Sequence, residues 1–248
     1  MKFSEAFKKL KNIPFISADN AKSLYNFVRK EKPSNVLELG IGHGTSSAYI
    51  AAALRKNGKG HLTCVDLEEV RNHFKPSAEE LLNELGLNDV VKIFRMKSGY
   101  NWFLHNEIKQ QTKGGNQYCE PKYDLIIIDG PKNWTIDSSS FFLSDKLLKQ
   151  KGWIIWDDYN WSYAKSNVEI IDRVDRRELD EQEKLIPHIK EIFHLLVMQH
   201  QDYGNFIIQE DSGWAWAQKI NSETKTIKYS SSRSLKSFFS AALKKMNK

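Results

Sequence analysis

The sequence predicts an α/β protein with a doubly wound, mostly parallel sheet of seven strands that ends in an antiparallel hairpin. Apolar runs of strand length alternate with segments of helical periodicity between residues 35 and 156. Glycine or acidic residues follow the ends of these runs, and sheets of this kind bind ligands at the carboxyl ends of their strands. Short apolar runs near the C-terminus predict the hairpin.

Two helices are expected before the sheet, over residues 3–11 and 18–31, because apolar side chains recur there at three- and four-residue spacing. Pro33 ends the second helix and leads into the first strand. Five buried strands follow, and they are expected at 35–39, 61–66, 90–96, 123–128 and 153–156. The helices after the first four strands are expected at about 45–56, 77–86, 100–112 and 138–149.

The region after the fifth strand is less regular. Residues 163–191 are highly charged and helix-like. Apolar runs then follow at 194–198, 205–208 and 214–217. A turn is expected at 202–204, between the first two of these runs, so the runs predict a late hairpin.

These elements divide the chain into N-terminal helices (1–34), a ligand-binding domain (35–220) and a basic amphipathic tail (221–248). The formal net charge of +6 is concentrated at the end of the chain, since eight Lys or Arg residues and one Glu fall from Lys219 onward. From Arg233 onward, apolar residues share one helical face, which predicts docking onto the domain or onto a second copy in a homodimer. Membrane contact through this face is the alternative.

Composition argues against several classes of protein. No apolar run approaches the length of a membrane-spanning helix, and the charged N-terminus lacks the apolar stretch of a signal peptide. Cys64 and Cys119 make no disulfide framework, so Cys64 is expected as a buried thiol and the location as cytoplasmic. Because the body before the tail is nearly neutral, no nucleic-acid partner is expected.

The most informative segment is residues 36–47, where an apolar strand runs into a loop with Gly40, Gly42 and Gly44 and then into a helix. Glycine lets the backbone turn tightly and approach a ligand, and the helix start presents free N–H groups there. Asp66 closes the next strand and is placed to accept hydrogen bonds from ribose hydroxyls. Together these features predict a nucleoside-bearing cofactor; a helix-entry loop without a ligand is the alternative.

The spacing of Glu38, Gly40, Gly42 and Gly44 resembles motif I of the class I S-adenosylmethionine-dependent methyltransferases, whereas dinucleotide enzymes prefer Gly-x-Gly-x-x-Gly. The resemblance implies a Rossmann-like methyltransferase fold with S-adenosylmethionine as cofactor. An acid near the loop suits the cationic groups of this cofactor. The implied cofactor-binding residues are Glu38, Gly40, Ile41, Gly42, His43, Gly44, Thr45, Ser46, Asp66, Leu67, Ser98, Gly99 and Asp129.

Three carboxylates, those of Asp129, Asp157 and Asp158, follow the ends of adjacent expected strands. Carboxylates gathered at one sheet edge repel one another unless they share a cation or a proton. Oxygen donors with room for water and substrate suit Mg²⁺, so these three are the expected metal ligands. Asp129 as a turn cap, and Asp157 with Asp158 as a solvated pair or helix cap, are the alternatives.

Lys132 follows Asp129 by three residues, and this pair resembles the metal-dependent O-methyltransferases of the catechol and caffeoyl-coenzyme A type. There an Asp closes the fourth strand, a Lys stands three residues later, and an Asp-Asn pair closes the fifth. This chain departs from that pattern in having Asp158 in place of the Asn. Asp129-Gly130 also resembles a broader methyltransferase family in which a His often follows, where this chain has Pro131.

The resemblance implies methyl transfer to an oxygen of a small molecule, assisted by Mg²⁺, with Lys132 and Asp129 as the catalytic residues. Lys132, if neutral, could take the proton of the acceptor hydroxyl; an ordinary surface lysine is the alternative. Residues 163–191 are expected to cover the acceptor, and four aromatic residues are expected to wall it. They are Trp102, Trp134, Tyr159 and Trp161, while Trp153, Trp214 and Trp216 are expected in the core.

Other functions stay open at this point. A nucleic-acid or protein methyltransferase is one, although 129–132 lacks the Pro-Pro-aromatic pattern of enzymes that modify exocyclic amines. An NAD-dependent oxidoreductase is another, disfavoured by the glycine spacing and the late hairpin. A cofactor-binding protein without catalysis is the third.

Overall fold

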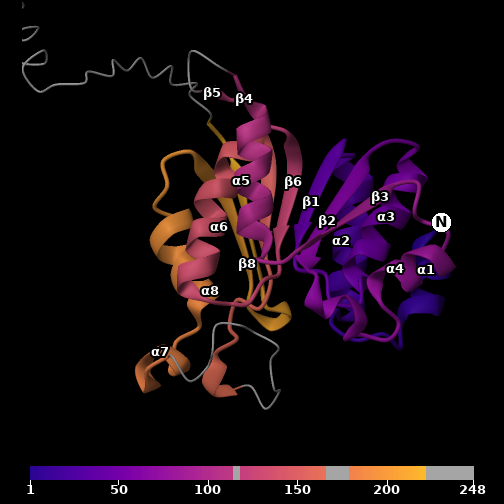
Figure 1. Ribbon diagram of the computed structural model, residues 1–248, viewed down its shortest axis with the longest axis horizontal. Helices are drawn as coiled ribbons and strands as arrows, with labels where there is room; N and C mark the ends of the chain where they lie inside the picture. The colour runs from indigo at the N-terminus through magenta and orange to yellow at the C-terminus, as the bar shows by residue number, and fades with distance from the viewer. Residues whose placement is uncertain (114–117, 166–178, 222–248) are drawn as a thin grey trace, which may run out of the picture.

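The computed structural model describes residues 1–113, 118–165 and 179–221 and contains a seven-stranded sheet with the order β3-β2-β1-β6-β7-β9-β8 (Figure 1). Strands β3, β2, β1, β6 and β7 pair in parallel. Strand β9 pairs antiparallel with both β7 and β8. The predicted fold class, a mostly parallel sheet that ends in an antiparallel hairpin, is confirmed.

The bounds of the elements agree with most of the expected ranges. The strands of the large sheet are β1 (Asn35–Leu39), β2 (His61–Leu67), β3 (Val91–Met96), β6 (Tyr123–Ile128), β7 (Leu148–Trp156), β8 (Tyr203–Gln209) and β9 (Trp214–Lys219). The helices are α1 (Phe3–Leu10), α2 (Ala18–Glu31), α3 (Thr45–Asn57), α4 (Ala78–Glu84), α5 (Tyr100–Gln111), α6 (Trp134–Leu147), α7 (Glu181–Leu185) and α8 (His188–Ile192). Strands β4 (Thr112–Lys113) and β5 (Tyr118–Cys119) form a separate short pair.

Two layers of helices cover the sheet. Buried residues of α1 to α4 form one core cluster with the side chains of one sheet face. Buried residues of α5, α6 and α8 form the second cluster with those of the other face. Figure 1 shows these two groups of helices apart from each other on either side of the strands. With apolar layers on both faces, β1 and β6 read as nearly continuous apolar runs in the sequence.

Local sequence signals explain several helix ends. Lys32 adopts the left-handed conformation that ends α2, just before Pro33. Gly58 ends α3 in the same way. The Ser77 side chain accepts from the backbone N–H of Glu80 while the Glu80 carboxylate accepts from that of Ser77, which starts α4 with a capping box.

The hairpin differs from the expected one. Residues 194–198, expected as a strand-like run, belong mainly to a π-helix (Phe193–Val197) that continues α8, because Phe193 and Val197, four apart, are both buried against the α6 side of the sheet. The hairpin is formed by β8 and β9, so its turn falls at 210–213 rather than at 202–204. Gly213, with a φ of 70°, supplies the left-handed residue that this turn needs.

Three other expectations differ in extent. Helix α6 starts at Trp134 instead of 138, because Asn133 caps it by accepting from the backbone N–H of Ile136. Strand β7 starts at Leu148 instead of 153, with an irregular register opposite Tyr123 and Leu125. Residues 163–191, which are expected to cover the acceptor, fall partly outside the described residues. The amphipathic face expected from Arg233 onward lies wholly outside them. Within the described part of the chain, every helix is too short or too polar to cross a membrane.

Candidate active site

A cavity of about 770 Å³ opens at the carboxyl ends of the parallel strands. Its lining includes the loop of residues 40–44 after β1, which we call the glycine bend, and Asp66 near the end of β2. The segment after β3 and the acidic residues after β6 and β7 line it as well. The sequence-predicted residues that line it are Gly40, Ile41, Gly42, Thr45, Ser46, Asp66, Leu67, Ser98, Gly99, Asp129, Lys132, Asp157 and Asp158.

The bend after β1 depends on glycine for two reasons. Gly40 has a φ of 84°, and a Cβ placed on it would lie 2.0 Å from the backbone oxygen of Asp129. Gly44 has a φ of 78°, and its Cβ would lie 2.9 Å from the Cβ of Ala78. The first contact joins the ends of β1 and β6, and the second lets α3 approach α4. The glycines therefore bring two strand ends and two helices together around the cavity.

Asp66 faces the cavity from the end of β2, as expected, with its side chain 14% exposed. Its Oδ2 accepts from the backbone N–H groups of Ile41 and Gly42, each at 3.2 Å. Its Oδ1 accepts from the N–H of Leu67 at 2.7 Å. Burial raises the pKa of Asp66 above its usual value, although these hydrogen bonds and the Arg95 charge oppose that shift. Asp66 therefore holds the backbone of the glycine bend in place and also lines the cavity.

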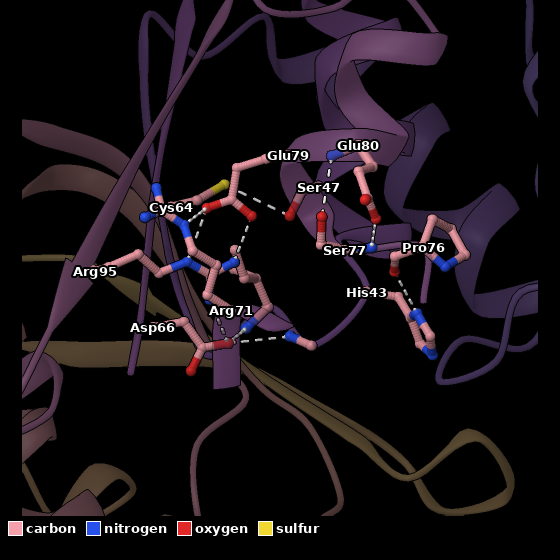
Figure 2. Close-up of polar contacts among 12 residues, drawn as sticks. His43, Ser47, Cys64, Asp66, Arg71, Pro76, Ser77, Glu79, Glu80 and Arg95 are labelled. Carbon is pink, nitrogen blue, oxygen red and sulfur yellow. Dashed lines mark hydrogen bonds and ion pairs between the residues drawn. The ribbon is translucent and has the colours of Figure 1, made fainter. Parts of the chain in front are cut away.

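Three of the predicted cofactor residues lie outside the described lining of the cavity: Glu38, His43 and Gly44. Glu38 is fully buried; its carboxylate accepts from the Ser47 hydroxyl and, at 3.6 Å, from the Cys64 thiol. His43 lies with Nδ1 2.8 Å from the Pro76 carbonyl oxygen. Figure 2 shows His43 beside Pro76 and Ser47 in contact with Cys64. Cys64 is a buried thiol without a disulfide, as its place in a core strand predicts.

Glu38 gives the fold a specific pH dependence. Burial raises its pKa from 4.5 to about 7. Between these values the unfolded chain releases a proton that the folded chain keeps, so the free energy of unfolding falls as pH rises, by about 3 kcal/mol in all. Glu38→Gln should remove this loss and make the protein more stable than wild type at pH 8. Urea unfolding between pH 4 and pH 8 measures the free energy of unfolding of wild type and of Glu38→Gln.

The control for this prediction is Glu84→Gln, which changes an exposed carboxyl at the end of α4 and should leave the wild-type slope intact. Parallel stability–pH curves for wild type and Glu38→Gln would contradict the prediction.

The acidic end of the cavity gathers Asp129, Asp157 and Asp158, each with a carboxylate oxygen within 4.8 Å of the others. Lys132 lies between two of them: its Nζ is 3.1 Å from Asp129 Oδ1 and 3.1 Å from Asp158 Oδ2. Asp157 Oδ1 accepts from the Trp214 indole N–H and from the Asp158 backbone N–H, each at 2.7 Å. The convergence expected from the sequence is therefore present, with Lys132 inside it.

The charges of this cluster decide the state of Lys132. Burial lowers the Lys132 pKa, but the carboxylates of Asp129, Asp158 and Asp157 outweigh that effect and hold the pKa well above its usual value. These carboxylates favour the ammonium form of Lys132, and its part as proton acceptor stays a prediction. Burial, together with the charges of Asp129 and Asp158, raises the Asp157 pKa in turn, because one lysine cannot balance three acids.

The loop after β6 is held by a buried pair behind the acids. The Tyr100 hydroxyl donates to Asp137 Oδ1, and Asp137 Oδ2 accepts from the Asn133 backbone N–H at 2.8 Å. A Cβ on Gly130 would lie 1.8 Å from the Tyr100 hydroxyl oxygen, so a larger residue there would have to displace the Tyr100 side chain from Asp137. Helices α5 and α6 thus set the path on which Asp129 and Lys132 lie.

Sequence analysis missed the N-terminal wall of the cavity. Phe15, with a φ of 78° and a ring 5.5 Å from that of Phe74, lies across Gly42. The Asn20 side-chain amide donates to the Ser212 carbonyl oxygen at 2.9 Å and so joins α2 to the hairpin turn. The further lining residues without a sequence-based assignment are Ile16, Ser17, Val70, His73, Tyr100, Asn101, Ile136 and Asp211. Neither periodicity nor a motif in the sequence marks these positions. The available signals are Pro14, which restricts the backbone before Phe15, and the aromatic side chains of Phe15 and Phe74.

Of the four expected aromatic wall residues, Trp161 lines the cavity. Trp102 is exposed and stacks on His105, and Tyr159 is buried with its hydroxyl 2.5 Å from His194 Nε2. Trp134 begins α6, half exposed, and like those two it lies outside the described lining. Trp214 and Trp216 are buried and Trp153 packs against the core beside them, as expected.

A family model described as a methyltransferase domain matches residues 37–159, which span the glycine bend, Asp66, the Asp129 loop and the two acids after β7. No curated protein sequence matches the chain.

Several solved structures have the same fold. The SAH-bound methyltransferase PaMTH1 of Podospora anserina is 15% identical, with 88% of this chain and 87% of that one covered and a TM-score of 0.61. The O-methyltransferase TomG of Streptomyces achromogenes, involved in tomaymycin synthesis and solved with SAM, is 18% identical, with 88% of both chains covered and a TM-score of 0.57. An O-methyltransferase of Bacillus cereus solved with SAH is 18% identical, with 88% and 90% covered and a TM-score of 0.57.

Proposed function

We propose that this chain, whose residues 37–159 match the methyltransferase domain model, transfers a methyl group from S-adenosylmethionine to an oxygen of a small molecule. One observation carries the proposal. A single cavity is lined both by the glycine bend with Asp66 and by the cluster of Asp129, Asp157, Asp158 and Lys132. A donor beside the bend and an acceptor beside the cluster would share this cavity, where alignment supplies much of the rate gain.

The donor end fits a nucleoside linked to a charged amino acid. Asp66 can accept from ribose hydroxyls, with Leu67, Ser98 and Gly99 beside it. Gly40, Thr45 and Ser46 leave room for the amino-acid part above the start of α3. The bound cofactor supplies a methyl group on a sulfonium, which needs no further activation. The S-adenosylmethionine and S-adenosylhomocysteine bound by solved proteins of this fold support the assignment.

The acceptor end fits a divalent cation. Asp129, Asp157 and Asp158 would hold it, because three carboxylates lie within reach of one centre and Lys132 offsets only part of their charge. Mg²⁺ prefers such oxygen donors and, when bound, lowers the pKa of an acceptor hydroxyl. Lys132 orients Asp129 and Asp158 as an ammonium ion. For Lys132 to act as the base, its ion pairs with Asp129 and Asp158 would have to break first.

Metal removal gives a direct test of the acceptor end. Treatment with a chelator should lower methyl transfer by about a hundredfold or more, and added Mg²⁺ should restore it, because the acidic cluster would no longer hold a Lewis acid. S-adenosylhomocysteine release from a panel of hydroxylated acceptors measures the rate. Binding of S-adenosylhomocysteine should stay unchanged as the internal control. Undiminished turnover in the chelator would show that the reaction proceeds without a divalent metal.

Calorimetry tests the donor assignment itself. S-adenosylhomocysteine and NAD are each titrated into the protein, with and without Mg²⁺. We expect S-adenosylhomocysteine to bind and NAD to fail, since the carboxylates near the bend repel a pyrophosphate. Binding of NAD without S-adenosylhomocysteine would overturn the proposed function in favour of an oxidoreductase.

Other expectations stay predictions beside this proposal. They are the three-part division of the chain, a cytoplasmic location, a homodimer, membrane contact through the tail and the lack of a nucleic-acid partner.

A further inference from the structure

A row of ion pairs joins the edge strand β3 to helix α4 and to the acid of β2 (Figure 2). Arg95, near the end of β3, has a side chain only 6% exposed. Its Nε and Nη2 donate to the two oxygens of Glu79 at 3.1 and 2.8 Å. Its Nη1 lies 3.7 Å from Asp66 Oδ2. Asp66 and Glu79 of α4 are therefore both ion-pair partners of the same buried guanidinium, that of Arg95.

The location of Arg95 is informative because a strand at the edge of a sheet could leave an arginine in water. Burying a guanidinium costs free energy unless carboxylates and hydrogen bonds compensate for the lost water. Glu79 compensates with a two-point contact, in which the Arg95 charge helps hold the Glu79 pKa down to about 2 although burial opposes it. The remaining arm of Arg95 is directed at Asp66 and at the Leu67 carbonyl oxygen, 3.5 Å away.

The distance between Arg95 and Asp66 matters for the chemistry of the acid. At 3.7 Å the guanidinium stabilises the carboxylate charge without taking one of its hydrogen-bonding positions. An ionised carboxylate has about four such positions, and the N–H groups of Ile41, Gly42 and Leu67 fill three of them. A position remains for a hydroxyl of the ligand.

We infer that Arg95 is a positioning residue of the donor site, held by Glu79 so that it keeps Asp66 charged and aimed at the ribose while leaving an oxygen position for a ribose hydroxyl. This inference rests on the proposed function, because it takes S-adenosylmethionine as the ligand of the cavity. It also links ligand binding to α4, since Glu79 lies on that helix and the segment before it supplies Val70 and Phe74 to the cavity wall.

The test compares S-adenosylhomocysteine with its analogue that lacks both ribose hydroxyls, by calorimetry on the full chain. We expect wild type to prefer the natural ribose by about tenfold or more, as a hydrogen bond to a charged group provides. In Arg95→Met the preference should fall to about threefold or less, and Arg95→Lys should restore part of it.

Arg71→Met is the matched control. Arg71 Nε also contacts Glu79 Oε1, at 3.1 Å, but its side chain is 53% exposed and its recorded ion pair is with Glu79, not with Asp66. This variant should keep the wild-type preference. If Arg95→Met unfolds, Glu79→Gln replaces it: Arg95 would then move onto Asp66 and take the remaining position, which should also lower the preference.

An unchanged preference in Arg95→Met, or in Glu79→Gln where that variant is needed, would overturn the inference. Equal weakening of both ligands would do the same, because it would show a role limited to the fold. These results differ from a failure of the proposed function, in which wild type itself would not bind S-adenosylhomocysteine.

Discussion

Gly40→Ala should destabilise the protein by about 2–5 kcal/mol and abolish binding of S-adenosylhomocysteine. Two costs add at this position. The φ of 84° disfavours any residue with a Cβ, and that Cβ would lie 2.0 Å from the oxygen and 2.7 Å from the carbon of the Asp129 carbonyl. Because the obstacle is backbone, relief requires the ends of β1 and β6 to separate. Urea unfolding measures the stability, and calorimetry measures the binding.

Gly58→Ala separates the two costs. Gly58 also has a positive φ, of 72°, but nothing lies within 4 Å of its added Cβ. It should therefore lose only about 1–2 kcal/mol and bind S-adenosylhomocysteine as wild type does. If Gly40→Ala lost no more stability than Gly58→Ala and still bound S-adenosylhomocysteine, the close approach of β1 and β6 would not be needed for stability or for binding.

Asp129→Asn should lower methyl transfer by about 10²- to 10⁴-fold while S-adenosylhomocysteine affinity changes by less than about fivefold. The substitution preserves the shape of the side chain but removes one of the three negative charges and one ionic partner of Lys132. Lys132→Met should show the same separation of turnover from binding. The rate is measured as S-adenosylhomocysteine release with an acceptor from the hydroxylated panel.

Asp211→Asn is the control for this pair, since Asp211 lines the same cavity but lies outside the cluster of Asp129, Asp157 and Asp158. We expect its rate within about threefold of wild type. A wild-type rate in both Asp129→Asn and Lys132→Met would remove the acidic cluster from the reaction. Methyl transfer would then depend on other residues of the cavity.

Much of the architecture could be predicted because its signals are local. The alternation of strands and helices, the bend at Gly40 and the acids that end β2, β6 and β7 depend on neighbouring residues only. The 194–198 run shows the limit of such signals. A short apolar run fits a strand and a helix equally well, and burial of Phe193 and Val197 on one side of the sheet decides for the helix.

The sequence by itself determined the class of fold, the strand ends at which the cavity opens, and most of the acids and glycines around it. These follow from periodicity and from the backbone needs of single residues. The tertiary structure alone decided that Phe15 and Asn20 wall the cavity, that Glu38 lies outside its lining, and that Arg95 reaches Asp66. It also decided that the Lys132 ammonium group lies between the carboxylates of Asp129 and Asp158, which raise the pKa of Lys132. Contacts between segments far apart in the chain, and the charge states that they set, leave no pattern in the order of residues.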